Sequence, residues 1–278
     1  MSHYTWKRIA WSCVLAVTPC SLFAVDGVVL IDQSHALAGN ITPGDTPGFP
    51  VTISQPGSYK LSGNLTVADA DTTAILITGE FVTLDLNGFS ISGPVVCTQF
   101  PTTCPAAGKG SGIQANMGFP GPRAIRILNG TVHGMGNFGI VMSGDSTFVE
   151  GVSADGNAGG GIEVAGTVVR SGASGNGAFG ILAVTVLNSN ATENVGDGII
   201  LDASGGVGMD NVASFNGGRG ILAQNATVTG NAIVRNNGAG ISAICPSSIS
   251  NNMIASNPTS ITFTNSEPCS LLNNATRP

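Results

Sequence analysis

The chain has 278 residues with 10 basic and 16 acidic side chains, a net charge of −6, and 9% charged against 42% hydrophobic residues. So few positive charges argue against a nucleic-acid or anionic-membrane partner, because such polyanions are bound chiefly by Lys and Arg. The composition also excludes a disordered chain, which needs high charge and low hydrophobicity.

The first 24 residues have the pattern of a secretory signal peptide. Lys7 and Arg8 form a basic start, residues 9–17 are apolar, and the sequence SLFA at residues 21–24 offers a cleavage site. The alternative is a short membrane anchor, but the apolar run is below the roughly 18 residues that a span requires. We therefore expect a secreted or extracytoplasmic protein, with no integral membrane segment, whose mature chain keeps 8 basic and 16 acidic residues.

The segments after the signal peptide read as a cap followed by short strands. Residues 25–50, with the Pro/Gly-rich stretch TPGDTPGFP, are interpreted as a cap over the first strand edge. Residues 51–67 predict two strands joined at Pro56-Gly57, and residues 81–93 and 124–134 each contain a Leu-Asn-Gly corner between apolar strands. Residues 265–278 are expected to form a C-terminal tail.

A Gly-Ile pair recurs along the second half of the chain. From Ile140 onward, successive isoleucines are 22, 19, 18, 22 and 20 residues apart. A period near 20 fits one turn of a chain that coils and stacks strand on strand. The pairs begin at Gly112, Gly139, Gly161, Gly180, Gly198, Gly220 and Gly240.

A repeated asparagine sets the register of these coils. It lies five residues before the isoleucine, at Asn157, Asn176, Asn194, Asn216 and Asn236. Apolar residues recur three and eight positions before it, which predicts three short strands per coil. The glycines and asparagines are interpreted as corner residues, and stacked asparagines can hydrogen-bond along the stack. The predicted fold is all-β: a single-domain parallel β-helix over residues 51–264.

These segments resemble the right-handed parallel β-helix proteins of the pectate-lyase type. The resemblance rests on DLNG at residues 85–88, LNGTVHG at residues 128–134 and the N-x-x-x-G-I coils. It implies the fold and a family that includes polysaccharide lyases, hydrolases, uronan epimerases and tailspikes. The catalytic residues of that family cannot be transferred, because the chain lacks an Asp-Asp pair, a Gly-His-Gly segment and an Arg-x-Lys segment.

Four cysteines remain after residue 24, an even number that favours disulfides in an oxidising compartment. Cys97 and Cys104 bracket a Pro/Thr-rich loop, and Cys245 and Cys269 are 24 residues apart, about one coil. We expect these two pairs to form disulfides. The alternatives are buried thiols or a zinc site, although no Cys-x-x-Cys spacing accompanies them.

The register also predicts which charged side chains point outward. His133 and Asp155 occupy the same outward position on adjacent coils, and Glu150 and Arg170 precede the repeated asparagine by seven and six residues. We expect these four to converge near one corner as a proton-transfer and anion-binding set. The alternative is a group of solvated, loosely paired surface charges. Glu163 and Asp202 also point outward, without an evident partner.

Two functions are compatible with the sequence. The first is an exported binding or structural module whose partner is a polysaccharide or cell-surface glycan. The alternative is a polysaccharide lyase, hydrolase or epimerase acting on an acidic polysaccharide, for which calcium would be the cofactor; no other cofactor is expected. The mature chain contains no Trp and a single Tyr, Tyr59, so it offers few rings for stacking on sugars.

A column of residues follows the repeated isoleucine and is partly apolar. Its members include Val141, Leu182, Ile200 and Leu222. If the isoleucine points inward, this column is an outward strip on which a partner, a second copy or a covering loop can dock. The alternative is a shift of register that places the column inside.

Overall fold

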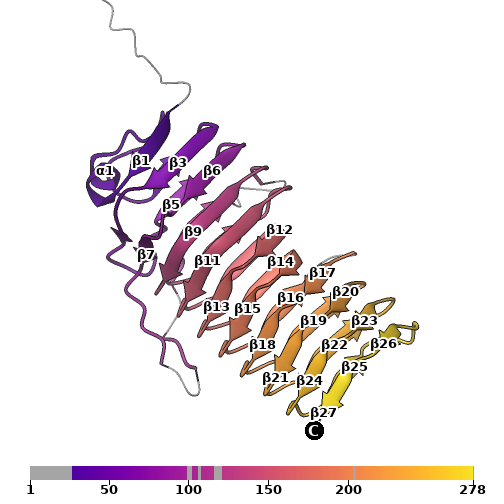
Figure 1. The fold of residues 1–278 in the computed structure, drawn as a ribbon. Coiled ribbons are helices and arrows are strands. Elements are labelled where there is room, and N and C mark those ends of the chain that lie inside the picture. Colours follow the sequence, from indigo (N-terminus) through magenta and orange to yellow (C-terminus); the bar gives the residue numbers. More distant parts are fainter. Residues whose placement is uncertain (1–26, 99–101, 106–107, 116–120, 203–204, 278) are drawn as a thin grey trace, which may run out of the picture.

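The computed structural model describes residues 27–98, 102–105, 108–115, 121–202 and 205–277. These residues form a parallel β-solenoid of about 10 turns, which runs as a rod from the N-terminal to the C-terminal end (Figure 1). The predicted all-β fold and its coiled architecture are therefore confirmed. The segment interpreted as a signal peptide lies outside the described residues.

Successive coils pair through parallel strands in one continuous sheet, whose three ladders along the rod we call sheets 1, 2 and 3. Sheet 1 contains β2 (Val51–Ile53), β5 (Ile75–Ile77), β8 (Ile113–Ala115), β10 (Ile140–Met142), β16 (Ile199–Leu201), β19 (Ile221–Gln224), β22 (Ile241–Ile244), β25 (Ile261–Phe263) and the first residues of β12 (Ile162–Val169) and β14 (Ile181–Leu187). Sheet 2 contains β1 (Val28–Ile31), β3 (Gly57–Leu61), β6 (Val82–Asp85), β17 (Val207–Met209), β20 (Thr227–Thr229), β23 (Ser248–Ser250), β26 (Ser270–Leu272), the first halves of β9 (Arg126–His133) and β11 (Phe148–Asp155), and the ends of β12 and β14. Sheet 3 contains β4 (Leu65–Thr66), β7 (Ser90–Ser92), β13 (Gly172–Ser174), β15 (Asn190–Thr192), β18 (Val212–Ser214), β21 (Ala232–Val234), β24 (Met253–Ala255), β27 (Ala275–Arg277) and the second halves of β9 and β11.

The repeated isoleucines form one inward column of sheet 1. They pair in register from coil to coil, and their side chains are buried from Ile113 to Ile241. The apolar positions three and eight residues before the repeated asparagine line sheets 3 and 2 in the same way, as Ala191 and Val186 illustrate. The three predicted columns therefore supply the core, because each coil buries its inner face only against its neighbours.

The repeated asparagines form the predicted ladder at the corner between sheets 3 and 1. Each side-chain amide donates to the Oδ1 atom of the asparagine one coil later, as Asn176 does to Asn194 at 2.9 Å. A second ladder lies at the corner between sheets 2 and 3 and was not predicted. It consists of Ser171, Ser189, Asn211, Asn231, Asn252 and Asn274. Its members precede the first ladder by five residues, so the same count would have found it.

The N-terminal end of the rod is covered by a short helix, α1 (Gln33–Ala38). Asp32 caps this helix by accepting from the His35 amide at 3.0 Å, and Ala36 is buried in the core. The residues just before the helix already belong to the solenoid, because β1 pairs with β3. The segment interpreted as a cap thus combines the first strand of sheet 2 with the covering helix.

The C-terminal end continues further than the sequence indicated. Residues 265–278 were expected to form a tail, but β26 and β27 pair with β23 and β24 and extend the solenoid to Arg277. The physical reason is the second ladder, since Asn274 accepts from the Asn252 amide at 2.9 Å and holds this coil without a Gly-Ile pair. Inward positions of the last coil remain exposed, with Phe263 at 46% and Leu271 at 49%.

Both expected disulfides are present, Cys97–Cys104 and Cys245–Cys269. The second links the end of sheet 1 in one coil to the start of sheet 2 in the last coil.

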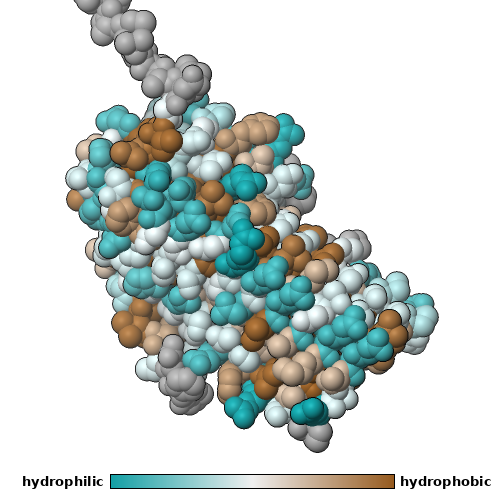
Figure 2. All heavy atoms as spheres, viewed as in Figure 1, coloured by the Kyte–Doolittle hydropathy of each residue, from teal (hydrophilic) through white to brown (hydrophobic). Residues whose placement is uncertain are grey.

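The outer face of sheet 1 carries the partly apolar column, in which Leu182, Ile200 and Leu222 are half-buried and Val141 is 5% exposed. Figure 2 shows that apolar residues on the visible face gather in separate patches between polar ones. No helix in the described part of the chain has the length and hydrophobicity that a membrane crossing requires.

Candidate functional site

Two of the predicted site residues lie next to each other at the end of sheet 3. His133 ends β9 and Asp155 ends β11, and the two strands pair in register at these residues. His133 is exposed, while Asp155 is half-buried and accepts a hydrogen bond from the Ser153 hydroxyl at 2.6 Å. The parallel pairing thus places an imidazole and a carboxylate on adjacent coils.

Burial raises the pKa of the Asp155 carboxyl above its usual value of 3.8. The Ser153 hydrogen bond, a backbone hydrogen bond from Ser174 and the charge of His133 act in the opposite direction without outweighing burial. A carboxyl with a raised pKa holds its proton more readily, so it is better suited to exchange a proton with a bound molecule.

The other two predicted residues form a separate pair. Glu150 lies in the sheet-2 half of β11, and its carboxylate forms an ion pair with the Arg170 guanidinium. The chain turns from sheet 2 to sheet 3 at Gly151, where φ is +65°. Glu150 and Asp155 therefore lie on different faces, and the structure brings the four residues together as two pairs, not as one cluster.

Hydroxyl groups continue the line of His133 and Asp155 along sheet 3. We call this column the lateral track; it consists of Ser92, His133, Asp155, Ser174, Thr192 and Ser214. Thr192 donates to Ser174 at 3.3 Å. Because successive parallel strands are about 4.8 Å apart, the track presents one polar group per coil in a straight line.

The first disulfide borders this track. The segment before Cys97 follows the end of sheet 3, and the Gly93 amide donates to the His133 carbonyl at 2.9 Å. The Cys97 Sγ atom lies 3.2 Å from the Gly156 carbonyl oxygen, and the Thr102 hydroxyl donates to the Glu193 carbonyl at 2.5 Å. The described residues Gly93, Cys97 and Thr102 therefore contact the coils of His133, Gly156 and Glu193 at the edge of the track.

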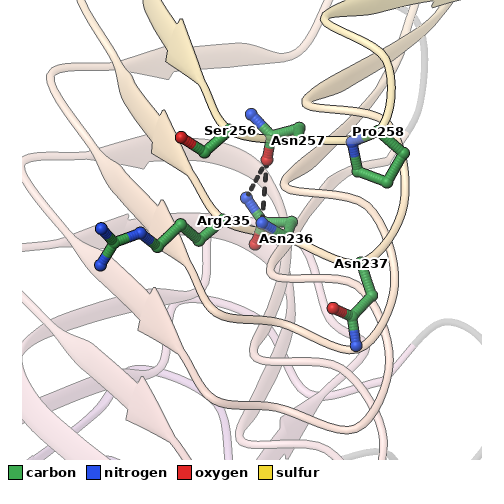
Figure 3. Close-up of a pocket in the computed structure, with 6 residues that line it drawn as sticks. All are labelled: Arg235, Asn236, Asn237, Ser256, Asn257 and Pro258. Atoms are coloured by element: carbon green, nitrogen blue, oxygen red, sulfur yellow. Dashed lines mark hydrogen bonds between the residues drawn. The ribbon is translucent and has the colours of Figure 1, made fainter. Parts of the chain in front are cut away.

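Two shallow hollows lie on either side of sheet 3. The first, of about 480 Å³, follows the corner between sheets 2 and 3, and its lining includes Ser153, Arg170 and Asn190. The second, of about 560 Å³, lies at the corner between sheets 3 and 1 (Figure 3). Its lining consists of Arg235, Asn236, Asn237, Ser256, Asn257 and Pro258. Both are open and polar, so they suit a hydrated ligand lying on the surface.

A further pair of carboxylates lies on the outer face of sheet 1. Glu163 pairs in register with Val141 and Leu182. Burial raises the pKa of its carboxyl, and the negative charge of Asp202 raises it further. These two residues thus influence each other, which the sequence did not indicate.

Within the described ranges, no three His, Cys, Asp or Glu side chains are grouped so that they can hold a metal ion.

Arg235, Asn237 and Ser256 were not among the predicted site residues. Arg235 and Ser256 occupy the corner position directly after the track, where the preceding coils have Gly134, Gly156, Gly175, Glu193 and Phe215. From Gly134 onward the residues at this position have positive φ, which is +56° at Arg235. Glycine is already replaced at Glu193, so no sequence signal at this corner distinguishes Arg235.

Comparison with known proteins places the chain in a fold family. Residues 111–276 match the model of the right handed beta helix region. The periplasmic alginate epimerase AlgG has a similar structure, with a TM-score of 0.54 at 14% identity over 90% of this chain and 84% of that one. The A-module of the Azotobacter vinelandii mannuronan C-5 epimerase AlgE4 gives 0.51 at 14% identity over 80% and 87%. No curated protein sequence matches significantly. Since the family match spans more than half of its length, the chain belongs to the right-handed β-helix family.

Proposed function

We propose that the protein is an exported glycan-binding β-helix that holds a polysaccharide along the lateral track. The observation that supports this is the run of polar groups at one-coil intervals, from Ser92 through His133 and Asp155 to Ser214. A linear chain of sugars presents hydroxyl groups at a similar repeat, so each coil can contribute one hydrogen bond to it. Two proteins that share the fold are named for alginate and mannuronan, which are polysaccharides.

Export is part of this proposal. The two disulfides favour an oxidising compartment, because thiols stay reduced in the cytosol of most cells. A location outside the cytoplasm also gives the protein access to polysaccharides. Fractionation of expressing cells tests the location, and recovery of the protein in the cytosolic fraction with free thiols would contradict it.

Binding is tested by retention of the purified protein on a panel of immobilised polysaccharides. The track variant Ser174→Ala/Thr192→Ala/Ser214→Ala removes three hydroxyl groups from sheet 3. Its matched control, Thr167→Ala/Thr185→Ala/Thr227→Ala, removes three hydroxyl groups from the outer face of sheet 2. We expect the track variant to bind at least tenfold more weakly and the control to bind normally.

The two variants give distinct outcomes. No retention of the wild-type protein on any polysaccharide would remove the glycan proposal. Retention that falls equally in both variants would place the ligand elsewhere on the rod. Melting temperatures of all three proteins are compared first, so that a loss of folding is not read as a loss of binding.

A second function is supported by the His133–Asp155 pair. The raised pKa of the Asp155 carboxyl and the adjacent imidazole are suited to move a proton at the carbon next to a uronate carboxylate, as a lyase or epimerase requires. In a lyase the proton leaves this carbon and the glycosidic oxygen departs from the neighbouring one, which leaves an unsaturated sugar. In an epimerase a proton returns to the opposite face of the same carbon.

This function is tested on polyuronates with and without added calcium. Ultraviolet absorbance detects the unsaturated product, and proton NMR detects inversion at the carbon that exchanges. His133→Ala should abolish turnover, whereas His35→Ala, which changes a histidine in α1, should leave it intact. Absence of both products from the wild-type protein would leave binding without catalysis.

A further inference from the structure

The hollow beyond the lateral track has a feature that the track lacks, a positive charge. Arg235 follows the strand that continues the column, since Val234 pairs in register with Ser214. It lies four coils beyond Asp155, or about 20 Å at the usual strand spacing. A polysaccharide on the track would therefore reach this hollow within a few sugar units.

The Arg235 guanidinium has no carboxylate partner among the described residues. It lies over the Phe215 ring at 5.5 Å from the centroid, a contact that orients the group and leaves its edge N–H donors free. The contrast is Arg219, which is held by the Asp197 carboxylate at 2.6 Å. Arg235 is thus a cation beside this hollow that remains available to an incoming anion.

The backbone at Arg235 follows the corner geometry of the neighbouring coils. Its φ of +56° belongs to the left-handed region, which costs an arginine about 1 kcal/mol more than a glycine. The equivalent residues Glu193, Phe215 and Ser256 have positive φ as well, so this corner presents one side chain per coil toward the surface.

The opposite rim of the hollow offers neutral polar groups. Figure 3 shows the side chains of Arg235 and Asn237 pointing away from each other, with the Asn236–Asn257 pair between them. That pair is fixed by hydrogen bonds of 2.9 and 3.0 Å and forms a rigid floor. The Asn237 amide is exposed on this opposite rim, whereas the exposed Ser256 hydroxyl lies on the same side as Arg235, one coil further along.

We propose that this hollow is an anionic-sugar subsite, in which Arg235 binds the oxyanion of an acidic sugar and Ser256 binds a hydroxyl group of the same sugar. The guanidinium donates two parallel hydrogen bonds to a carboxylate or a sulfate ester. The inference rests on the proposed glycan function and adds the class of sugar. The positive charge of Arg235 favours an oxyanion within a polymer that the neutral groups of the track already hold.

Isothermal titration with oligouronates, their carboxyl-reduced neutral counterparts and sulfated oligosaccharides tests the subsite. Arg235→Gln should weaken binding of the charged probe at least tenfold and leave the neutral probe unchanged. Arg126→Gln is the matched control, because Arg126 is also exposed and lies over a ring, that of Phe148 at 4.3 Å, but on sheet 2. It should bind like the wild-type protein.

The outcomes separate this inference from the function on which it rests. A wild-type protein that binds no probe removes the glycan proposal itself. A wild-type protein that binds all probes equally, or an Arg235→Gln variant that matches it, overturns the subsite alone. Equal losses in the Arg235 and Arg126 variants also overturn it, because they indicate general attraction by charge. Preference between the uronate and the sulfated probe identifies the oxyanion.

Discussion

Asn194 donates from its side-chain amide to the Asn216 Oδ1 atom at 2.9 Å, one coil further along the rod. The same amide donates to the Ala173 carbonyl at 3.1 Å, and the Asn194 Oδ1 atom accepts from the Asn176 backbone at 3.1 Å and from its amide. One buried side chain therefore joins three coils. Its contacts are polar and enclosed, so their loss leaves groups without partners.

Replacing Asn194 with alanine should lower the free energy of unfolding by about 3 kcal/mol, because buried donors and acceptors lose their partners. Denaturant unfolding followed by circular dichroism measures the change. Asn190→Ala is the control, since Asn190 is exposed on the same coil and should change stability by less than about 0.5 kcal/mol. Similar losses in the two variants would show that the ladder contributes little.

Gly180→Ala should destabilise the fold by about 3 kcal/mol, since a core that is already filled must shift to admit the methyl group. An added Cβ atom would lie 2.7 Å from the Gly198 carbonyl oxygen and 2.9 Å from the Ala191 Cβ atom. Thermal unfolding measures the effect. Gly156→Ala is the comparison: its Cβ would meet no atom within 4 Å, and its cost of about 1 kcal/mol comes from the left-handed φ of +59°. The reverse order would contradict the close stacking of coils.

Removal of the second disulfide, as Cys245→Ala/Cys269→Ala, should destabilise the last coil by about 3 kcal/mol, because the bond closes a loop of 24 residues. Hydrogen exchange resolves this effect by position. Faster exchange is expected in β25 and β26, while β10 should exchange at its wild-type rate. Uniform acceleration along the rod would indicate that the coils unfold together.

Asp155→Asn should stabilise the protein at pH 7 by up to about 1 kcal/mol, the usual size of such surface terms. The raised pKa of the Asp155 carboxyl means that the folded state favours the protonated form. Protonation of the Asp155 carboxyl thus stabilises the folded state. This contribution is complete below pH 3.8 and is lost as the pH rises through the folded-state pKa. The advantage of the asparagine variant should therefore disappear in acid, as a pH series of unfolding curves would show.

Ser153→Ala tests the same electrostatics from the other side. The variant removes the hydrogen bond of 2.6 Å that favours the charged Asp155 carboxylate. Its loss of stability should thus be larger at pH 7 than at pH 3. A loss that does not depend on pH would mean that the hydroxyl acts on packing and not on the charge.

The fold was predictable because it follows from the regular spacing of repeated residues in the sequence, which does not depend on distant contacts. Gly180 and Ile181 repeat in each coil since every coil meets the same neighbours, and Asn176 repeats for the same reason. The candidate site was predictable only in part. Register alone placed His133 beside Asp155, but it could not show that the turn at Gly151 separates Glu150 from them.

The features that were missed depend on irregular contacts. The helix α1 covers the core through Ala36, a residue with no distinctive sequence signal. The disulfide loop lies beside the track because Thr102 reaches a carbonyl 91 residues away, at Glu193. Neither contact repeats from coil to coil, so no regular spacing in the sequence predicts it. The last coil was misjudged for a related reason, because its stacking uses Asn274 in place of the Gly-Ile pair.

The two ends of the rod differ, and that difference gives unfolding a direction. Ala36 closes the core at one end, whereas Leu271, an inward residue of the last coil, is 49% exposed at the other. Thermal unfolding should therefore begin at the C-terminal coil and proceed along the rod, because each coil that unfolds exposes the next one. The Asn237 rim of the second hollow is only a coil or two from that end. His133 lies many coils away from it, toward the N-terminal end of the rod. On gentle heating the rod should lose its charged hollow well before it loses the imidazole–carboxylate pair. A single molecule would then pass through a shortened form that keeps one half of the proposed binding surface.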